Sequence, residues 1–346
     1  MPRGLTIDGS LGQLHSDTDV ASIEPAVAAA PGNVRLQFDE PLLDAVLAAT
    51  ADVIRRYPEV ELRAYGSQVD PTLSWLSGFE HVEHLALDLW YAASFDRLVG
   101  FTSLRSLSLG ETASKRPSLS FLRDLPQLEV LWLEAHDKDF DAVGEVESLR
   151  RLHLRVPRVK TLDSLRGHTN IEVLSMSFGG VRDLSPLADL PRLRGFELYQ
   201  VRNLDTGDLD ALGTCCALEA VSLGALRNVG SLRAFGQGPS STLRFLTLER
   251  LTGLATLADL ASCQRLEQLG LYESRPTDKR LDVLLGCPNL TRLVVGDVYP
   301  NDQLDALRDG FGGDTLLVRG EAVRGDRADV KVLWRMPVHK QLADPT

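Results

Sequence analysis

The densest group of residues that can do chemistry lies between Glu134 and Asp141, where one histidine stands among four carboxylates. Carboxylate oxygens and imidazole nitrogens ligate divalent cations, so this stretch could hold a metal. Its spacing matches no metal motif, however, and a solvated acidic turn is the interpretation that we favour. The segment Asp205–Asp208 resembles half of a calcium loop, but Asp208 is better placed to cap a helix. We therefore expect no metal and no other cofactor.

No arrangement of catalytic residues emerges from the sequence. Alignment of the repeats described below brings no Ser–His–Asp, Cys–His or paired-carboxylate set together in one pocket. The segments 1–58 and 301–346 are each too short for an ordinary catalytic domain. The sequence therefore predicts that the protein is not an enzyme.

The elements that must position any functional side chain come from a repeat. The pattern L-x-x-L-x-L, with conservative replacements, occurs ten times at spacings of 21 to 25 residues. The alternating leucines of such a pattern point inward from a short strand, and the residues between them point outward. The ten copies begin at Val82, Leu104, Leu128, Leu149, Ile171, Leu193, Leu218, Leu243, Leu266 and Leu290.

This pattern resembles the leucine-rich-repeat family, whose repeats are about 20–29 residues long. The resemblance covers residues 57–300; segment 183–190 is similar to internalin-type repeats, and segment 284–290 to cysteine-containing and ribonuclease-inhibitor types. It implies an α/β solenoid, a curved horseshoe with a parallel β-sheet on the concave face and helical or extended segments on the convex face. The family's asparagine after each strand is replaced, for example by His136 or Ser274. We therefore expect irregular turns along that edge.

Three segments are expected, because a solenoid end would expose its leucines without a cap. Residues 1–58 form an N-terminal cap, residues 59–300 the repeats, and residues 301–346 a C-terminal cap. In the first cap we expect strands at Val34–Phe38 and from Val60, with a helix between them that Pro41 opens. One face of that helix carries Leu42, Leu43, Val46, Leu47, Val53, Ile54 and Tyr57. The role of residues 1–31 stays open, apart from an edge strand at 5–7.

The C-terminal cap is expected to begin with a helix at 303–311. Two strands, 315–323 and 329–336, would then form a hairpin around a Gly325–Asp326 turn and cover the last repeat. Residues after Pro337 are expected to fray.

Two columns of the aligned repeats favour a structural role. The residue after the first leucine alternates between glutamate and arginine through nine repeats, beginning with Glu83 and Arg105. Parallel strands place these residues side by side, so we interpret the column as ion pairs that hold repeats in register. A charged rim that binds a partner is the alternative. Cys215, Cys263 and Cys287 share an inward apolar position, which indicates free thiols in the core.

Large side chains at the outward strand positions are the candidate contact residues. Solvent-facing aromatics are costly unless covered, and tryptophan and tyrosine are enriched in interface hot spots. Rows of small residues alternate with these bulky rows; the alternative is that some aromatics pack on one another. The predicted partner-binding residues, including neighbouring acids, are Asp88, Trp90, Trp132, Glu134, His153, Phe178, Glu197, Tyr199, Phe245, Glu249 and Tyr272.

Composition restricts the kind of partner. The net charge of −11 and the pI near 5.2 argue against nucleic acid or an anionic membrane, and favour a neutral or basic protein surface. The first residues contain no secretory h-region, and no run of about 18 apolar residues occurs. Four cysteines without a C-x-x-C pair suit a reducing compartment, so we expect a cytoplasmic and, from its composition, bacterial protein. A monomer is the favoured state.

These observations predict a protein–protein interaction module that binds its partner on the concave face. A more specific version is an inhibitor or immunity-type protein that sequesters a basic enzyme or toxin. The alternative is an enzyme or small-ligand-binding protein with its site between the N-terminal cap and the first repeats. A deep pocket near Tyr65 and Trp90 would favour that alternative.

Overall fold

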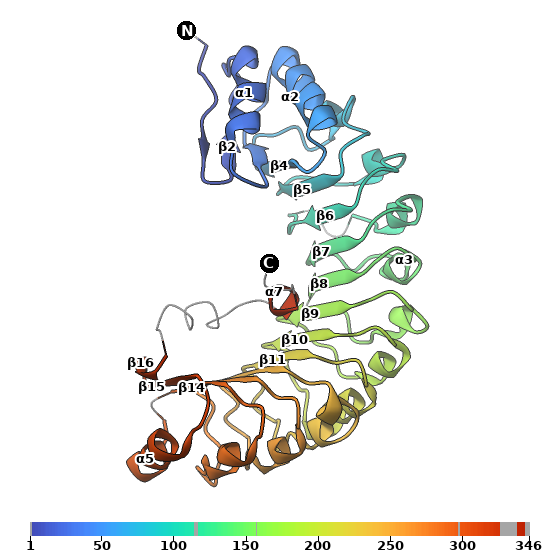
Figure 1. Cartoon of the computed structure of the whole chain (residues 1–346). Helices are drawn as coiled ribbons and strands as arrows, with labels where there is room; N and C mark the ends of the chain where they lie inside the picture. Colours follow the sequence, from blue (N-terminus) through green and yellow to red (C-terminus); the bar gives the residue numbers. More distant parts are fainter. Residues whose placement is uncertain (1, 114–116, 157, 297, 326–337, 343–346) are drawn as a thin grey trace. The chain divides into compact units, whose positions relative to one another are not determined.

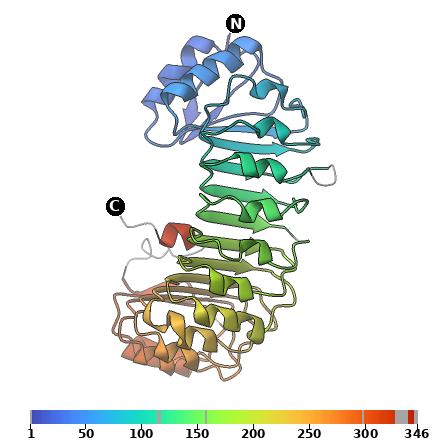
Figure 2. The same cartoon turned by 90° about the vertical axis from the view of Figure 1, so that its right-hand side faces the viewer.

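The computed structural model describes residues 2–113, 117–156, 158–296, 298–325 and 338–342. The chain forms two compact units, Met1–Arg155 and Val156–Thr346, called unit 1 and unit 2 below. In each unit, short strands stack side by side with one strand for each repeat, and short helices lie on one side of the strands (Figures 1 and 2). The outward side chains of the strands form the opposite surface, which we call the strand face of each unit.

Unit 1 begins with a hairpin and two long helices, and continues into the repeats. Strands β2 to β8 are parallel, with one-to-one register such as Leu107 with Leu131. Its elements are β1 (Ile7–Asp8), β2 (Leu11–Gln13), α1 (Val20–Ala29), β3 (Arg35–Phe38), α2 (Asp44–Arg56), β4 (Glu61–Gly66), η1 (Ser74–Leu76), β5 (His84–Leu89), η2 (Asp96–Leu98), β6 (Ser106–Leu109), η3 (Ser120–Asp124), β7 (Val130–Glu134), α3 (Asp141–Gly144) and β8 (Arg151–Arg155).

Unit 2 continues the same architecture. Strands β9 to β15 are parallel, and β16 pairs antiparallel with β15. Its elements are η4 (Asp163–Leu165), β9 (Val173–Ser177), η5 (Ser185–Asp189), β10 (Gly195–Tyr199), α4 (Thr206–Leu209), η6 (Asp210–Thr214), β11 (Ala220–Gly224), η7 (Arg233–Gly236), η8 (Gly238–Ser241), β12 (Phe245–Glu249), η9 (Ala258–Ser262), β13 (Gln268–Tyr272), η10 (Asp282–Gly286), β14 (Arg292–Val295), α5 (Asn301–Gly310), β15 (Thr315–Val318), β16 (Glu321–Arg324) and α7 (Val338–Gln341).

The repeated leucines form the core between the strands and the returning segments. Leu104, Leu131, Leu174 and Leu246 are each at most 1% exposed. Burial of each leucine side chain contributes about 1.5–3 kcal/mol, which explains why the pattern fixes the fold. A repeat of 21 to 25 residues leaves little room after its strand and turns, so most returns are single 3₁₀ turns rather than long helices. The predicted repeats are confirmed.

Six of the turns after the strands share one backbone conformation, so the expectation of irregular turns holds for only part of this edge. A non-glycine residue in the left-handed conformation follows each of six strands, with φ between 51° and 62°. In most of these turns, the backbone N–H of the left-handed residue donates a hydrogen bond to a carbonyl oxygen of the next repeat. For example, the Gln200 N–H donates to the Gly224 carbonyl at 2.9 Å. This backbone ladder satisfies the turn without an asparagine. The six residues are Ala135, Phe178, Gln200, Ala225, Arg250 and Glu273.

At two of the positions where the family has asparagine, the side chain adds to this ladder. His136 Nε2 lies 2.9 Å from the carbonyl oxygen of Gly110 in the preceding repeat. The Ser274 hydroxyl accepts a hydrogen bond from the Leu251 N–H at 3.1 Å. Each therefore bonds the turn backbone of a neighbouring repeat, as the missing asparagine would.

The N-terminal cap differs from its predicted form in detail. The two strands occur as predicted, but the helix α2 begins at Asp44 rather than near Pro41, and Leu43 is 61% exposed instead of facing inward. The sequence analysis also missed α1, which contains Pro25 and packs against α2. The edge strand is β1, paired with β2 at Ile7–Asp8.

The end of unit 2 departs further from expectation. The hairpin turns at Arg319–Gly320, both with positive φ, rather than at residues 325–326, because a two-residue turn of that kind suits the twist of paired strands. The expected strand at 329–336 lies outside the described residues. Residues 338–341 form the helix α7 instead of fraying, and Val338 is fully buried.

Candidate partner-binding surface

The predicted contact residues fall on both strand faces. Unit 1 carries Asp88, Trp90, Trp132, Glu134 and His153, and unit 2 carries Phe178, Glu197, Tyr199, Phe245, Glu249 and Tyr272. Each face is described separately, because the two differ in what covers them.

An aromatic pair marks the strand face of unit 1. Trp132 on β7 is paired in register with His153 on β8, and their rings stack with centroids 4.8 Å apart and an angle of 23° between planes. His153 is 7% exposed, whereas Trp132 remains 42% exposed. The histidine therefore supports one face of the indole, and the tryptophan presents the other face to solvent. Trp132 is the better candidate for direct contact.

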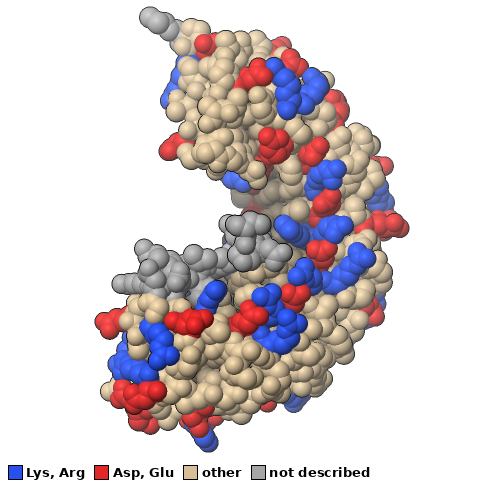
Figure 3. Space-filling model, viewed as in Figure 1, with Lys and Arg blue, Asp and Glu red and all other residues tan. Residues whose placement is uncertain are grey.

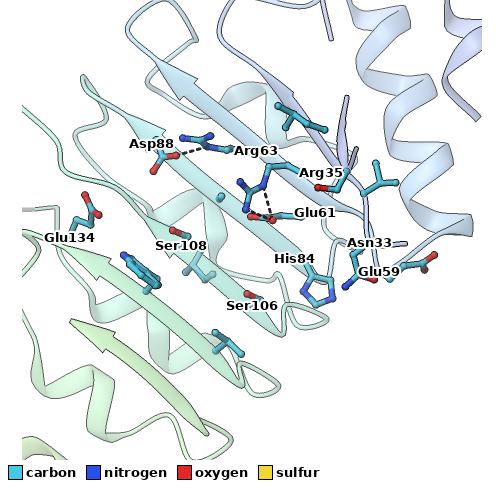
Figure 4. Close-up of a pocket in the computed structure, with 17 residues that line it drawn as sticks. Asn33, Arg35, Glu59, Glu61, Arg63, His84, Asp88, Ser106, Ser108 and Glu134 are labelled. Carbon is cyan, nitrogen blue, oxygen red and sulfur yellow. Dashed lines mark hydrogen bonds and ion pairs between the residues drawn. The ribbon is translucent and has the colours of Figure 1, made fainter. Parts of the chain in front are cut away.

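A groove of about 730 Å³ borders Trp132 on the strand face of unit 1. Trp132 and outward side chains of the strands from β3 onward line it. Figure 4 shows Arg35, Arg63, Asp88 and Ser108 along this groove. Two ion pairs cross neighbouring strands along the groove: Arg35 to Glu61 at 2.8 Å and Arg63 to Asp88 at 2.6 Å. Asp88 is thus held by an arginine of the preceding strand.

The N-terminal cap supplies a polar network beside this groove. Gln37 donates to Gln13 at 2.9 Å and accepts from Arg63 at 3.2 Å, while the Tyr65 hydroxyl donates to Gln13 at 3.1 Å. The Arg63 guanidinium also lies over the Tyr65 ring, 5.0 Å from its centroid. This network was not predicted, because the strands β2 to β4 lack the full L-x-x-L-x-L pattern. The alternation around Leu36 and Leu62 was the available signal.

The remaining predicted residues of unit 1 lie at the ends of strands. Trp90 and Tyr91 follow β5 and are 47% and 57% exposed, but neither lines the groove. Glu134 at the end of β7 lines the groove and lies 3.6 Å from Arg155. The exposed aromatics Trp90 and Trp132 therefore belong to one unit but to different parts of its surface.

Aromatic residues on unit 2 are more enclosed. The rings of Phe178 and Tyr199 meet edge to face at 5.9 Å, and only Phe178 is exposed, at 44%. The Arg244 guanidinium covers the ring of Phe245, and Glu249 lies 3.6 Å from Arg250.

Tyr272 does not present the contact surface that the sequence analysis expected. It is 9% exposed and packs with Val294 and Leu317, and burial raises the pKa of its hydroxyl to about 12. The Tyr272 ring is buried there because the outward residues of the neighbouring strands are apolar.

The helix α7 packs on the strand face of unit 2 at its first three strands. It packs against β9, β10 and β11, and both views show it lying along these strands (Figures 1 and 2). Gly195 makes room for it: a Cβ at this position would lie 2.5 Å from Val338 Cγ1 and 2.8 Å from Leu342 Cδ1. Small outward residues of β10 and β11 therefore make room for the chain's own C-terminal segment, whereas the row with Ser106 and Ser108 lines the groove of unit 1.

Glu197 contacts this segment. It is half-buried, and its carboxylate accepts hydrogen bonds from the Ser175 hydroxyl and the Val338 backbone N–H. Burial raises the pKa of Glu197, and the two hydrogen bonds oppose that shift. The predicted role of Glu197 in partner binding stays a prediction, and α7 competes with a partner for its carboxylate.

Ion pairs account for the alternating charge column. Arg105 contacts Glu83 at 3.1 Å and Glu129 at 2.7 Å, and Arg194 contacts Glu219 at 2.7 Å. Acidic and basic side chains are accordingly interspersed over the surface that Figure 3 displays. The predicted ion pairs of this column are confirmed, and their role in holding the repeats in register stays a prediction.

The other chemically active residues also have structural partners. Asp205 caps α4, and Asp208 accepts from the Asp205 N–H to complete a capping box. Among the described residues, no group of three His, Cys, Asp or Glu side chains is placed to hold a metal ion. The inward cysteines are buried, which raises the pKa of Cys215 to about 11 and that of Cys263 to about 12. Their assignment to the core is confirmed.

The described helices are short or polar. None of them has both the length and the apolar character needed to cross a membrane.

Comparisons with known proteins agree with this architecture. No protein-family model and no curated protein matches the chain. An internalin from Listeria monocytogenes is similar in structure, with a TM-score of 0.55 and 18% identity over 82% of this chain and 85% of the internalin. A chain of the Toll–Spatzle complex of Drosophila has a TM-score of 0.53 and 16% identity over 96% of this chain and 53% of that chain. Together with the ten repeats and the parallel sheet, these likenesses show that the protein has the leucine-rich-repeat fold.

Proposed function

We propose that this protein is a non-enzymatic protein-binding module, and that the groove on the strand face of unit 1 contacts its partner. The observation that carries this proposal is Trp132, whose indole is 42% exposed and supported from behind by the His153 ring. A rigid, half-exposed tryptophan beside a groove has the properties of an interface hot spot, since it loses little conformational freedom on binding.

The groove favours a protein segment over a compact small molecule. It runs along outward residues of successive parallel strands, and strands lie about 4.8 Å apart, so it is elongated rather than closed. Its charged lining favours a neutral or basic partner, because four acids stand beside two arginines. These residues are Arg35, Glu59, Glu61, Arg63, Asp88 and Glu134.

A narrower proposal is that binding sequesters a basic enzyme or toxin, as an inhibitor or immunity-type protein in the cytoplasm would. The acidic groove and the overall charge of −11 support a basic target. The buried free thiols suit a reducing compartment. Co-purification of a catalytically inactive basic enzyme with the protein would support this version.

The second candidate function is small-ligand binding between the N-terminal cap and the first repeats. The groove lies at that place and is lined by His84, Ser106 and Ser108, which offer polar groups to a ligand. Neither Tyr65 nor Trp90 lines it, however. This candidate therefore depends on the polar lining of the groove, and not on the deep pocket that was expected near Tyr65 and Trp90.

Site-directed photo-crosslinking tests the proposed surface. A photoreactive amino acid replaces Ser108 in the groove or, as a control, Leu285, which is exposed on η10 in unit 2. We expect a crosslinked partner protein from Ser108 in host lysate, and its loss when Trp132→Ala is added. Crosslinks from Leu285 alone, or crosslinks at Ser108 that survive Trp132→Ala, would contradict the proposal.

A further inference from the structure

Two consecutive repeats of unit 2 share a short motif after their strands. Val201–Leu204 reads Val-Arg-Asn-Leu, and Leu226–Val229 reads Leu-Arg-Asn-Val. Arg202 stands three residues after the end of β10, and Arg227 three residues after the end of β11. These strands are neighbours, so the two turns lie side by side. The apolar residues of both motifs are buried, and both Arg-Asn pairs are exposed.

These two arginines bring the same charge to equivalent positions of neighbouring turns. Like charges on adjacent strands or turns repel each other, whereas the glutamate–arginine column alternates in sign. Within the described residues, neither the Arg202 nor the Arg227 guanidinium has an ion pair or a side-chain hydrogen bond. Asp205, the nearest acid in sequence, is engaged by the Gly207 and Asp208 N–H groups. The two guanidinium groups therefore keep their donors available.

Both motifs line one cavity of about 520 Å³. Arg202, Asn203, Arg227 and Asn228 contribute to its wall, and the exposed ring of Phe178 from the preceding repeat completes it. Cavities that hold small ligands measure about 300–1,000 Å³, so the size suits a ligand somewhat larger than a bare anion. The wall combines two cations, two amides and one aromatic ring.

We propose that this cavity binds an aryl phosphate, with the phosphate between Arg202 and Arg227 and the aromatic ring against Phe178. Guanidinium groups form paired hydrogen bonds with phosphate oxygens, and a dianion would convert the repulsion between the arginines into attraction. The asparagine amides supply further donors at the rim. The site lies on unit 2, apart from the Trp132 groove of unit 1, and is independent of the proposed function.

Titration of the full-length protein with phenyl phosphate, followed by calorimetry or ligand-observed NMR, tests this assignment. We expect saturable binding that weakens with salt, and a loss of about tenfold for Arg202→Gln or Arg227→Gln, as one charge-assisted hydrogen bond would give. Arg233→Gln is the matched control, because Arg233 is an exposed arginine of the same unit that already pairs with Asp210. Absence of saturable binding, or unchanged binding by the double variant R202Q/R227Q, would overturn the assignment.

Two further measurements test the contribution of the Phe178 ring and the source of the aryl phosphate. Phe178→Leu should weaken phenyl phosphate but not inorganic phosphate; equal binding of both anions by the wild type would overturn the role of the ring. A phosphotyrosine peptide that binds more tightly than phenyl phosphate would indicate a modified protein as the source, and weaker binding a small molecule; both support the cavity.

Thermal unfolding without ligand provides a readout that does not depend on the probe. At low ionic strength, Arg202→Gln should raise the melting temperature because it removes like-charge repulsion, whereas Arg233→Gln should not. A lowered melting temperature for Arg202→Gln would show that the arginine supports the fold, which would overturn the assignment.

Discussion

The strand faces of the two units are built from the same strand positions but carry different surfaces. In unit 1, Trp132 and ion pairs such as Arg63–Asp88 line an open groove together with small outward residues such as Ser108. In unit 2, Gly195 and Ala220 leave a recess, and Val338 of the same chain fills it. Small outward residues occur on both faces, so they make room for a covering segment but do not by themselves bring one. The face of unit 2 differs because a segment of the same chain packs against it.

The largest expected effect concerns the open face. Trp132→Ala should weaken partner binding by about 2 kcal/mol or more, roughly thirtyfold, because truncation removes the exposed anchor of the groove. The unfolding free energy should change little, since the indole is only partly buried. Biolayer interferometry with the partner identified by crosslinking measures the dissociation constant. Leu285→Ala is the control, and an equal loss for that variant would contradict a specific role for unit 1.

Release of α7 should expose the strand face of unit 2. Val338→Asp should release α7, because full burial of a valine is worth about 1.5 kcal/mol and a charge cannot take its place. A cysteine introduced at Ser222 on β11, the strand beside the Glu197 strand, should then react with iodoacetamide about tenfold faster. Peptide-level mass spectrometry separates it from the native Cys216. An introduced cysteine at Ser108 in unit 1 should react equally fast with and without Val338→Asp; equal rates at Ser222 would show that α7 does not cover this surface.

Acidification should act on the two units in opposite directions. Burial lowers the pKa of His136 in unit 1, so its contribution to stability is present above the unfolded value near 6.5 and falls as the pH decreases through that range. Burial raises the pKa of Glu197 in unit 2, so its contribution to α7 docking is present below about 4.5 and is lost as the pH rises through the raised value.

Two variants separate these pH effects. Replacement of His136 by Asn should flatten the dependence of the melting temperature between about pH 7 and pH 5, since the asparagine does not titrate. Glu197→Gln should flatten the pH dependence of α7 release, measured by hydrogen exchange of residues 338–342. The serines Ser175 and Ser222 of the flanking strands do not titrate. A pH dependence that survives Glu197→Gln would show that Glu197 does not control α7 release.

The smallest expected effect concerns the charge column, which the two units share. Arg105→Gln in unit 1 and Arg244→Gln in unit 2 each remove ion pairs of partly exposed side chains. Each variant should lose less than about 1 kcal/mol of unfolding free energy, and less in high salt. Urea denaturation measures the loss. A loss of several kcal/mol in one unit alone would show that the column does more there than maintain register.

The periodic features of the fold could be predicted from the sequence, because each repeat reports the same physical requirement. The inward leucines, the core cysteines and the alternating Glu83–Arg105 column follow from the alignment, and the structure places them as predicted. The backbone ladder of the turns could not be predicted, because no side-chain pattern marks the left-handed residue Gln200 or Ala225.

The candidate surfaces were only partly predictable, because they depend on contacts between segments far apart in sequence. Trp132 was found from its outward position, but the groove beside it also needs Arg35 of the cap. The burial of Glu197 depends on Val338, about 140 residues later, and no local pattern announces that contact. The binding role of the predicted residues stays a prediction.

Hydrogen–deuterium exchange of the full-length protein with and without its crosslinked partner tests the central claim most directly. The account predicts that the partner protects peptides of β5 to β7, around Trp132, and leaves those of β9 to β11 unchanged. Protection confined to β9–β11, with β5–β7 unaffected, would contradict the assignment of the unit 1 groove as the partner-binding surface.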